Sequence, residues 1–211
     1  MLDTKTIKEF IDELGSNSPA PGGGSVAALS SSLASALSAM VFSLTVGKKA
    51  YNNMNDEEKA LVDNNLEITG RLKNEFLTLM NKDTEVFNSL MEAFKLPKET
   101  EEEKAARSEK IQEGYKAAIQ VPLEVARKTY DLYENILVAV KYGNKNAISD
   151  GGVAALMAQS AIEGAILNVK INLSAIKDDN YKEAMEKEIK NLSQSGLEKQ
   201  KEILRIVEEN L

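Results

Sequence analysis

One stretch of this sequence restricts the fold more than any other, because Glu13 and Lys48 enclose a long run without a single charged side chain. The run opens with a turn rich in proline and glycine at Pro19–Gly24, and from Ser25 onward it contains no residue that breaks a helix. Seven serines lie among alanines and larger apolar residues before Val46. A helix that is neutral on all sides is typical of a buried central helix. Its serines argue against a membrane span, although the length would suffice.

The turn before this helix is a candidate binding site. Gly22, Gly23 and Gly24 permit backbone angles that other residues resist, and Ser25 follows them directly. The first N–H groups of a helix have no partner within it, so they present donors to an anion or a carbonyl group. We expect these four residues to contact a ligand. The alternative is a purely structural turn.

The rest of the chain carries apolar residues at helical spacing, and no segment shows the sustained alternation of a strand. This pattern predicts an all-α bundle of about six or seven helices that forms one domain over residues 1–211. The expected helices are Asp3–Leu14 (capped by Asp3 or Thr4), Ser25 to about Gly47, Asn55 or Asp56 to about Lys95, Thr100 to about Gln120, Val121–Tyr142 after a kink or restart at Pro122, a helix that begins at Ser149, and a last helix that Asp179 or Asn180 caps and that ends at Leu211.

Composition excludes several classes of function. The formal net charge is −7 and there is no long basic run, which argues against nucleic acid and anionic membranes as partners. The N-terminus is acidic and amphipathic from Asp3, unlike a signal peptide, so we expect a cytoplasmic protein. Histidine and cysteine are absent, which argues against disulfides, thiolate chemistry and a zinc site. Acid–base chemistry must therefore use Asp, Glu, Lys or Tyr.

Asp83 is the carboxylate that the helical pattern places where an apolar side chain is expected. An unpaired buried carboxylate is costly, and burial raises its pKa, which suits a general acid or base. The alternative is a core carboxylate that a lysine or backbone N–H groups satisfy. The apolar stripe that encloses Asp83 consists of Leu61, Ile68, Leu72, Phe76, Leu79, Phe87, Leu90 and Phe94.

Three polar residues near the small-residue helix that begins at Ser149 are further candidates. Asp150 precedes Gly-Gly-Val-Ala and is either a functional carboxylate or a plain N-cap. Asn168 and Asn172 are four residues apart, so they project from one helical face. They either bond to a neighbouring helix or hold a polar ring of a ligand.

Three residues after the uncharged helix are the last candidates. Lys48 and Lys49 either complement the C-terminal end of that helix or form an anion site for a ligand carboxylate. Tyr51 either stacks on an aromatic ligand or packs in the core or an interface.

Four segments in order carry a resemblance that covers nearly the whole chain. They are Pro19-Ala20-Pro21-Gly22-Gly23-Gly24-Ser25-Val26-Ala27-Ala28-Leu29, the segment Thr45–Tyr51, the stretch Asp83–Pro97 and the stretch Ser149–Asn172. With these segments the sequence resembles the cyclodeaminase/cyclohydrolase family of folate enzymes. The resemblance implies an all-helical homodimer that acts on one-carbon derivatives of tetrahydrofolate. It implies no metal and no cofactor beyond the tetrahydrofolate that carries the one-carbon unit.

Two reactions are implied by this resemblance: hydrolysis of 5,10-methenyltetrahydrofolate to 10-formyltetrahydrofolate, and cyclisation of 5-formiminotetrahydrofolate with loss of ammonia. Because no transferase domain accompanies this chain, we expect the cyclohydrolase. Asp83 is then expected to transfer protons and Asp150 to bind the pterin, although these roles could be exchanged. Lys48 and Lys49 are expected to meet the glutamate tail. The competing hypothesis is a non-catalytic helical module that dimerises through its small-residue helices.

Overall fold

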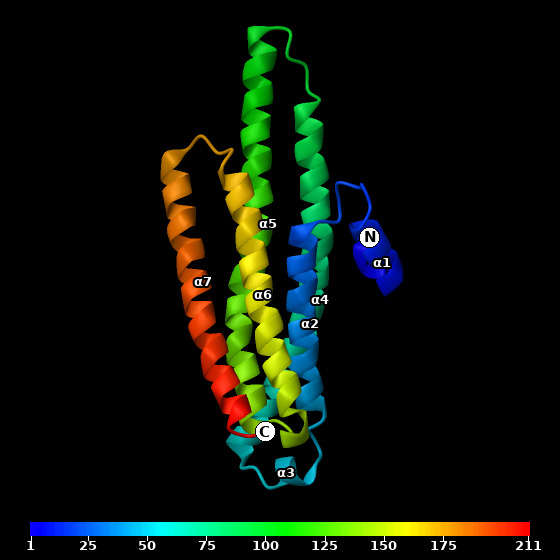
Figure 1. Ribbon diagram of the computed structural model, residues 1–211, viewed down its shortest axis with the longest axis vertical. Helices are drawn as coiled ribbons and strands as arrows, with labels where there is room; N and C mark the ends of the chain where they lie inside the picture. The colour runs from blue at the N-terminus through cyan, green and yellow to red at the C-terminus, as the bar shows by residue number, and fades with distance from the viewer.

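The computed structural model describes residues 1–211 and contains seven α-helices, two 3-10 turns and no β-strand, which confirms the predicted all-α class. Five of the helices are long and lie side by side as a bundle (Figure 1). The elements are η1 (Leu2–Thr4), α1 (Ile7–Leu14), α2 (Gly23–Ser43), α3 (Lys49–Asn52), α4 (Asp56–Phe94), α5 (Glu101–Tyr142), η2 (Lys145–Ala147), α6 (Ile148–Leu173) and α7 (Asp179–Glu208).

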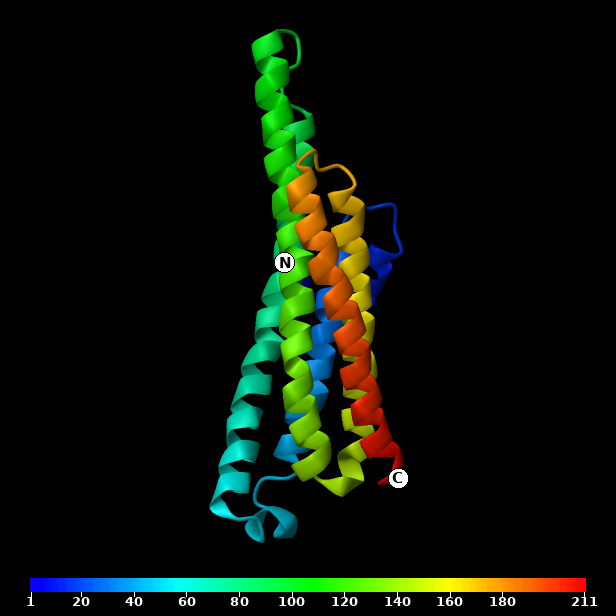
Figure 2. The same cartoon turned by 90° about the vertical axis from the view of Figure 1, so that its left-hand side faces the viewer.

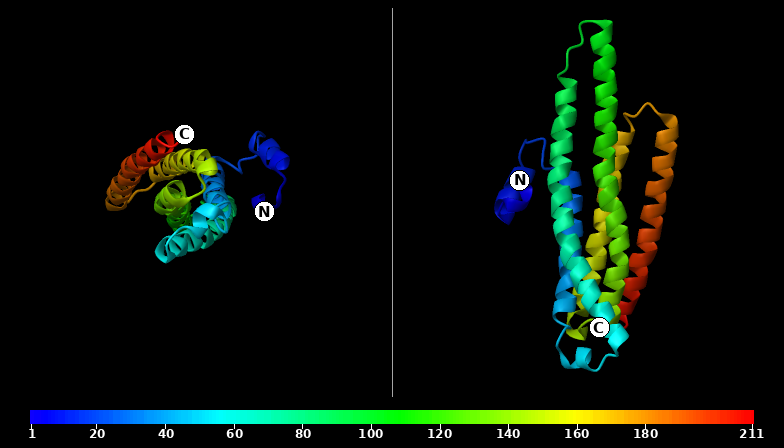
Figure 3. Two further views of the ribbon diagram at one scale, coloured as in Figure 1. Left: turned by 90° about the horizontal axis from the view of Figure 1, so that it is seen from below. Right: turned by 180° about the vertical axis from the view of Figure 1, so that it is seen from behind.

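Helix α5 occupies the middle of the bundle, in contact with α2, α4, α6 and α7. Viewed along the bundle in Figure 3, α7, α6, α2 and α4 follow one another around it. At one end α4 and α5 extend beyond the other helices as a two-helix arm (Figures 1 and 2). Helix α1 lies outside the bundle beside α2 and α4 (Figure 1).

The serines of α2 allow it to pack closely against three neighbours. Ser30 Oγ donates to the carbonyl of Met157 on α6 (3.0 Å), and Ser32 Oγ donates to the carbonyl of Lys73 on α4 (2.8 Å). Ser31 Oγ lies 2.6 Å from a threonine hydroxyl of α5. Each hydroxyl therefore meets a partner on another helix, which removes the cost of burying it.

One face of α2 is not buried, contrary to the prediction of a helix covered on all sides. Val26, Leu33 and Met40 recur every seven residues along this face and are 38%, 47% and 37% exposed. They continue onto α6, where Val153 and Leu156 are also exposed. The two small-residue helices thus present one apolar surface to the outside.

The start of each of three helices is set by a capping box. The side chains of Thr6, Asn55 and Thr100 each accept a hydrogen bond from the N–H three residues later, and the glutamate at that position accepts one from the backbone N–H of the cap residue. The acidic run Glu101–Glu103 is the first turn of α5, where negative charge complements the helix dipole.

The N-terminal helix differs from the prediction. It begins at Ile7 rather than near Asp3 or Thr4, which form a separate 3-10 turn with Leu2. Ile7 and Ile11 are 81% and 57% exposed, because α1 lies outside the bundle and buries only Phe10.

Other helix ends also differ. Helix α2 ends at Ser43, because the chain turns there and reaches a positive φ of 74° at Gly47. Helix α5 continues without interruption through Pro122, where the sequence predicted a kink or a restart. Helix α7 is capped by Asp178, one residue earlier than expected.

The predicted apolar stripes are mostly confirmed. In α4, Phe76, Leu79 and Leu90 are buried, whereas Leu61 and Phe94 at its two ends are 37% and 38% exposed. A straight helix drifts relative to a fixed contact line, so the ends of a long stripe leave the core. In α6 the apolar residues Ile162, Ile166, Val169 and Leu173 are buried, and so is Ile176 just after the end of the helix.

Two segments are long and apolar enough to cross a membrane by length and composition alone, Gly23–Ser43 and Lys145–Leu173. In this bundle 61% and 56% of their most apolar windows are buried against other helices. Their composition is thus accounted for by packing within the protein.

Candidate active site

The glycine turn, the first turn of α2 and the middle of α4 meet at a cavity of about 300 Å³, which α5 and α6 close on the other sides. Seven of the eleven residues predicted as site residues lie in or beside it: Gly22, Gly23, Gly24, Ser25, Asp83, Asn168 and Asn172. The sequence segments that carry them are far apart in the chain, so the bundle assembles this group.

Asp83 projects from α4 onto the start of α2. Its Oδ2 accepts a hydrogen bond of 2.9 Å from the Ser25 hydroxyl, which also lies 3.4 Å from Thr84 Oγ1. Gly22 is the N-cap of α2 and has no side chain that could cap it. The carboxylate of a neighbouring helix therefore stands where a capping side chain would be, with its negative charge at the positive end of the helix.

Two effects act in opposite directions on the Asp83 carboxyl. Burial raises its pKa above the ordinary value, and the hydrogen bonds from Ser25, through side chain and backbone, lower it again, with burial the larger effect. No other titratable side chain lines the cavity. The chain holds no group of three or more His, Cys, Asp or Glu residues that could bind a metal ion.

Two of the glycines allow side chains to approach the backbone of α2. A Cβ atom on Gly24 would lie 2.7 Å from Asp83 Cγ and 2.8 Å from Oδ2, and one on Gly23 would lie 3.1 Å from Asn168 Nδ2. A Cβ atom on Gly22 would meet nothing within 4 Å. Glycine is thus required at positions 23 and 24, because a side chain there would collide with a residue that lines the cavity.

The two asparagines present oxygen atoms to the cavity. Asn168 Nδ2 donates to the carbonyl of Gly164 (2.9 Å), and Asn172 Nδ2 donates to the carbonyls of Asn168 (3.0 Å) and Ala118 (3.2 Å). Carbonyl oxygens only accept, so these contacts fix which end of each amide is the nitrogen. Neither Oδ1 atom has a donor in the protein. The cavity is therefore rich in acceptors and has no basic side chain.

The other four predicted residues lie at the opposite end of the bundle. Helix α2 rises about 30 Å between Gly23 and Ser43, and Lys48 and Lys49 come after its end. They line a second cavity of about 510 Å³ that also contains Lys141, Lys145 and one carboxylate, Glu58. Within one chain this basic cavity and the Asp83 cavity cannot contact the same small molecule.

Asp150 and Tyr51 also lie at this opposite end of the bundle. Asp150 lies in the first turn of α6, about 27 Å along the helix from Asn168, and its side chain makes no hydrogen bond. The N-cap is Ala147, so the alternative prediction of a capping aspartate is wrong. Tyr51 donates its hydroxyl to Asp63 (2.8 Å) and packs on a small apolar cluster.

Several lining residues were not predicted from the sequence. Phe87 lies four residues after Asp83, so its place on the same face of α4 could have marked it. Thr84, Ala118, Val121 and Ile171 carry no local signal, because only the packing of four helices brings them to the cavity.

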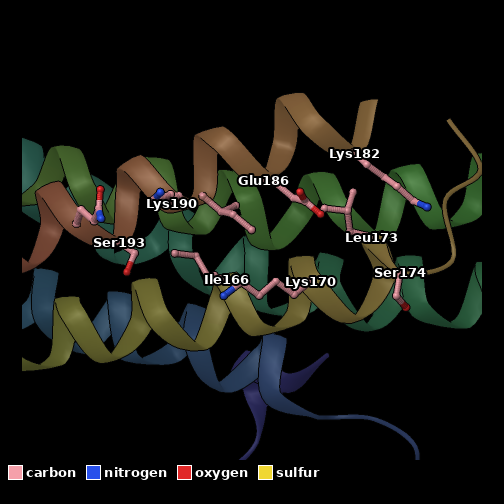
Figure 4. Close-up of a pocket in the computed structure, with 10 residues that line it drawn as sticks. Ile166, Lys170, Leu173, Ser174, Lys182, Glu186, Lys190 and Ser193 are labelled. Carbon is pink, nitrogen blue, oxygen red and sulfur yellow. The ribbon is translucent and has the colours of Figure 1, made fainter. Parts of the chain in front are cut away.

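A larger groove of about 620 Å³ lies between α6 and α7 (Figure 4). Asn168 is two residues from both Ile166 and Lys170, so it projects from another face of α6. Lys170, Lys182 and Lys190 extend along the groove, and Glu186 is its one carboxylate. No glycine lines this groove, so no side chain there approaches a helix backbone as Asp83 approaches that of Gly24. The smaller cavity that contains Asp83 is therefore the candidate active site.

The fold and the cavity define an all-helical bundle whose candidate site is built on one partly buried carboxylate at a helix N-terminus. Residues 6–191 match the family model described as formiminotransferase-cyclodeaminase. The chain is 39% identical to a methenyltetrahydrofolate cyclohydrolase of Methylorubrum extorquens, over 91% of this chain and 90% of that protein. This chain belongs to the formiminotransferase-cyclodeaminase family.

Two further relatives extend the comparison. A formimidoyltransferase-cyclodeaminase of Gallus gallus is 36% identical over 86% of this chain, which spans only 33% of that longer protein. A crystal structure of a formiminotetrahydrofolate cyclodeaminase from Thermotoga maritima superposes with a TM-score of 0.85 at 27% identity and covers 99% of this chain and 98% of its own. The bundle as a whole is thus a shared fold.

The glycine turn yields a test with a matched control. Gly24→Ala should lower kcat about 10- to 100-fold, because the added methyl group displaces the Asp83 carboxylate from its place. Gly70→Ala, on α4 outside the cavity, also places its methyl group in open space and should retain turnover within about twofold. Steady-state kinetics on both variants, with circular dichroism to verify folding, measures the difference. A loss of turnover in Gly24→Ala that only matches its loss of folded protein would indicate a purely structural turn.

Proposed function

We propose that this protein is a methenyltetrahydrofolate cyclohydrolase that hydrolyses 5,10-methenyltetrahydrofolate to 10-formyltetrahydrofolate. The observation that carries the proposal is the Asp83 carboxyl, whose pKa is raised by burial and which is the one titratable group of the cavity. A chain without histidine needs such a carboxylate for proton transfer. The similarity to the Methylorubrum extorquens cyclohydrolase supports the choice of substrate.

The charge of the cavity suits this substrate. The methenyl bridge is a cation shared between N5 and N10, and it is flanked by the N–H donors of a reduced pterin. The cavity offers one carboxylate and the Oδ1 atoms of Asn168 and Asn172, without a lysine or arginine that would repel a cation. Acceptors fixed before the ligand arrives favour the bound cation without reorganisation.

In the first step a water molecule adds to the methenyl carbon. Asp83 accepts a proton from this water as the C–O bond forms, and the product is a neutral tetrahedral carbinolamine. A carboxylate with a raised pKa is a stronger base than an ordinary aspartate while it is still ionised. The Ser25 hydroxyl holds the carboxylate in place through its 2.9 Å hydrogen bond.

In the second step the carbinolamine collapses. The bond from carbon to N5 breaks, Asp83 returns its proton to N5, and the hydroxyl oxygen loses its proton as the formyl C=O forms. In total, the methenyl cation and one water molecule give 10-formyltetrahydrofolate and one proton, and this proton is released to solvent. One carboxyl group thus acts as base and then as acid.

Cyclodeaminase activity is the second candidate, because the Thermotoga maritima structure of the same fold bears that name. In that reaction N10 attacks the formimino carbon, and the departing nitrogen must take up a proton to leave as ammonia. Asp83 would supply that proton. The same site serves both reactions, so both folates belong in the assay.

A homodimer would join the two ends of the molecule into one site. The apolar surface of α2 and α6 defined by Val26, Leu33, Met40, Val153 and Leu156 has no partner in one chain. If a second copy packs on it in the antiparallel direction about a twofold axis, each α2 N-terminus lies beside the partner's α2 C-terminus.

This arrangement gives a role to the four predicted residues that lie at the C-terminal end of α2. Lys48 of the partner subunit and Lys49 of the partner subunit would meet the carboxylates of the glutamate tail. Asp150 of the partner subunit would accept bonds from the pterin amino group or ring N–H, and Tyr51 of the partner subunit would contact an aromatic ring. The reaction uses free folates, which agrees with a cytoplasmic location.

Asp83→Asn tests the catalytic role. The amide can still accept from Ser25 and caps a helix about as well as aspartate, so the free energy of unfolding should change by less than about 1 kcal/mol. Turnover should fall about 10²- to 10⁴-fold because the amide takes up no proton. The wild-type rate should fall as pH decreases through the raised pKa of Asp83, with a midpoint above 3.8, since catalysis needs the ionised form.

The absorbance change of the folate follows this reaction, and Asp131→Asn, on the exposed side of α5, is the control. A folded Asp83→Asn protein with near wild-type turnover of 5,10-methenyltetrahydrofolate and of 5-formiminotetrahydrofolate would remove Asp83 from the mechanism.

Leu33→Glu tests the dimer. The side chain is 47% exposed in one chain, so the charge should leave the fold intact but disrupt pairing and raise KM at least about tenfold. Light scattering at micromolar concentration should give twice the chain mass for the wild type and a single chain mass for the variant. Leu197→Glu, on exposed α7, should remain dimeric. A monomeric wild type with full turnover would contradict this arrangement.

A further inference from the structure

A proline lies inside α5, directly after a residue that lines the Asp83 cavity. Pro122 has no N–H group, so it cannot donate to the carbonyl of Ala118, which precedes it by four residues. That carbonyl is thereby left without its usual helical partner. Ala118 and Val121 both line the cavity, so the interruption of the helical ladder occurs where it can affect a ligand.

The carbonyl of Ala118 accepts a hydrogen bond from another helix instead. Asn172 Nδ2, on α6, donates to it at 3.2 Å and to the carbonyl of Asn168 at 3.0 Å. Both hydrogens of the amide are used, and both acceptors are carbonyls that accept only. The amide of Asn172 is therefore held in one orientation, with Oδ1 as its unoccupied acceptor at the cavity.

Asn168 provides an internal comparison. Its Nδ2 donates to the carbonyl of Gly164 in its own helix, at 2.9 Å, and makes no hydrogen bond to α5. A change at the Ala118 carbonyl should therefore affect the side-chain amide of Asn172 and not the side-chain amide of Asn168.

We infer that Pro122 is a positioning residue of the site: it frees the Ala118 carbonyl to hold the Asn172 amide, so that Asn172 Oδ1 accepts an N–H group of the ligand. Any residue other than proline at position 122 would have a backbone N–H group. That group would donate to the Ala118 carbonyl and compete with Asn172 for it. The identity of the ligand as a reduced pterin rests on the proposed function. The hydrogen bond and its dependence on Pro122 do not.

The first test is nuclear magnetic resonance of the ¹⁵N-labelled full-length protein, which needs no substrate. Asn172→Ala identifies the side-chain NH₂ signals of Asn172 by their loss, and Asn168→Ala does the same for Asn168. In the wild type both Asn172 hydrogens should exchange with solvent more slowly than those of Asn168. Pro122→Ala should shift the Asn172 signals and speed their exchange, and leave those of Asn168 unchanged.

The second test is a double-mutant cycle on KM for 5,10-methenyltetrahydrofolate. Pro122→Ala and Asn172→Ala should each raise KM about 3- to 10-fold, the loss expected for one hydrogen bond, and more than they lower kcat. The double variant should be no worse than Asn172→Ala alone, because one interaction is removed twice. Pro122→Ala combined with Asn168→Ala should give the product of the two single effects.

Alanine is a better helix former than proline, so Pro122→Ala should fold. Unchanged Asn172 signals in that variant would overturn the inference, as would multiplicative effects of Pro122→Ala and Asn172→Ala on KM. If the variant does not fold, wild-type exchange at Asn172 as fast as at Asn168 would overturn it equally. A protein that shows the spectroscopic effect but turns over neither folate would refute the proposed function and leave this inference supported.

Discussion

The site depends on one interaction, that between the Asp83 carboxylate and the first turn of α2. Burial makes the ionised carboxylate costly, and the Ser25 hydrogen bonds and the positive end of the helix offset part of that cost. The balance leaves a carboxyl group that gains a proton more readily than a free aspartate. A stronger cap would lower the pKa of this carboxyl and a weaker one would raise it further, so the geometry of the turn tunes its basicity.

This requirement explains the unusual composition of α2. A carboxylate reaches the backbone only where Gly24 has no side chain, and the helix reaches α4, α5 and α6 closely because alanine and serine face them. The four-helix contact then brings the acceptors Asn168 and Asn172 to the same place. The exposed apolar residues of α2 and α6 are the remaining face of the same two helices, which agrees with pairing of two copies.

Sequence reasoning succeeded where periodicity carries the information. Asp83 interrupts an apolar stripe, and Asn168 and Asn172 share a helical face, so spacing marked them as candidates, and the structure brings all three to one cavity. It failed where tertiary packing decides. Nothing near Ala118 indicates that its carbonyl meets another helix, and nothing near Asp150 indicates a distance of about 27 Å from Asn168 within one chain. The exposure of Ile7 could not be predicted from the sequence either, because an amphipathic pattern does not reveal whether a partner surface exists.

The central claim is that burial, opposed by Ser25, sets the protonation of Asp83. Its most direct test is a ¹³C titration of the side-chain carboxyl groups in the folded protein, with the Asp83 signal assigned by its loss in Asp83→Asn. The account predicts that this one carboxyl titrates at a pH above the ordinary aspartate value of 3.8, and that Ser25→Ala raises the midpoint further by removing the hydroxyl hydrogen bond. A midpoint at or below 3.8, unchanged by Ser25→Ala, would contradict it.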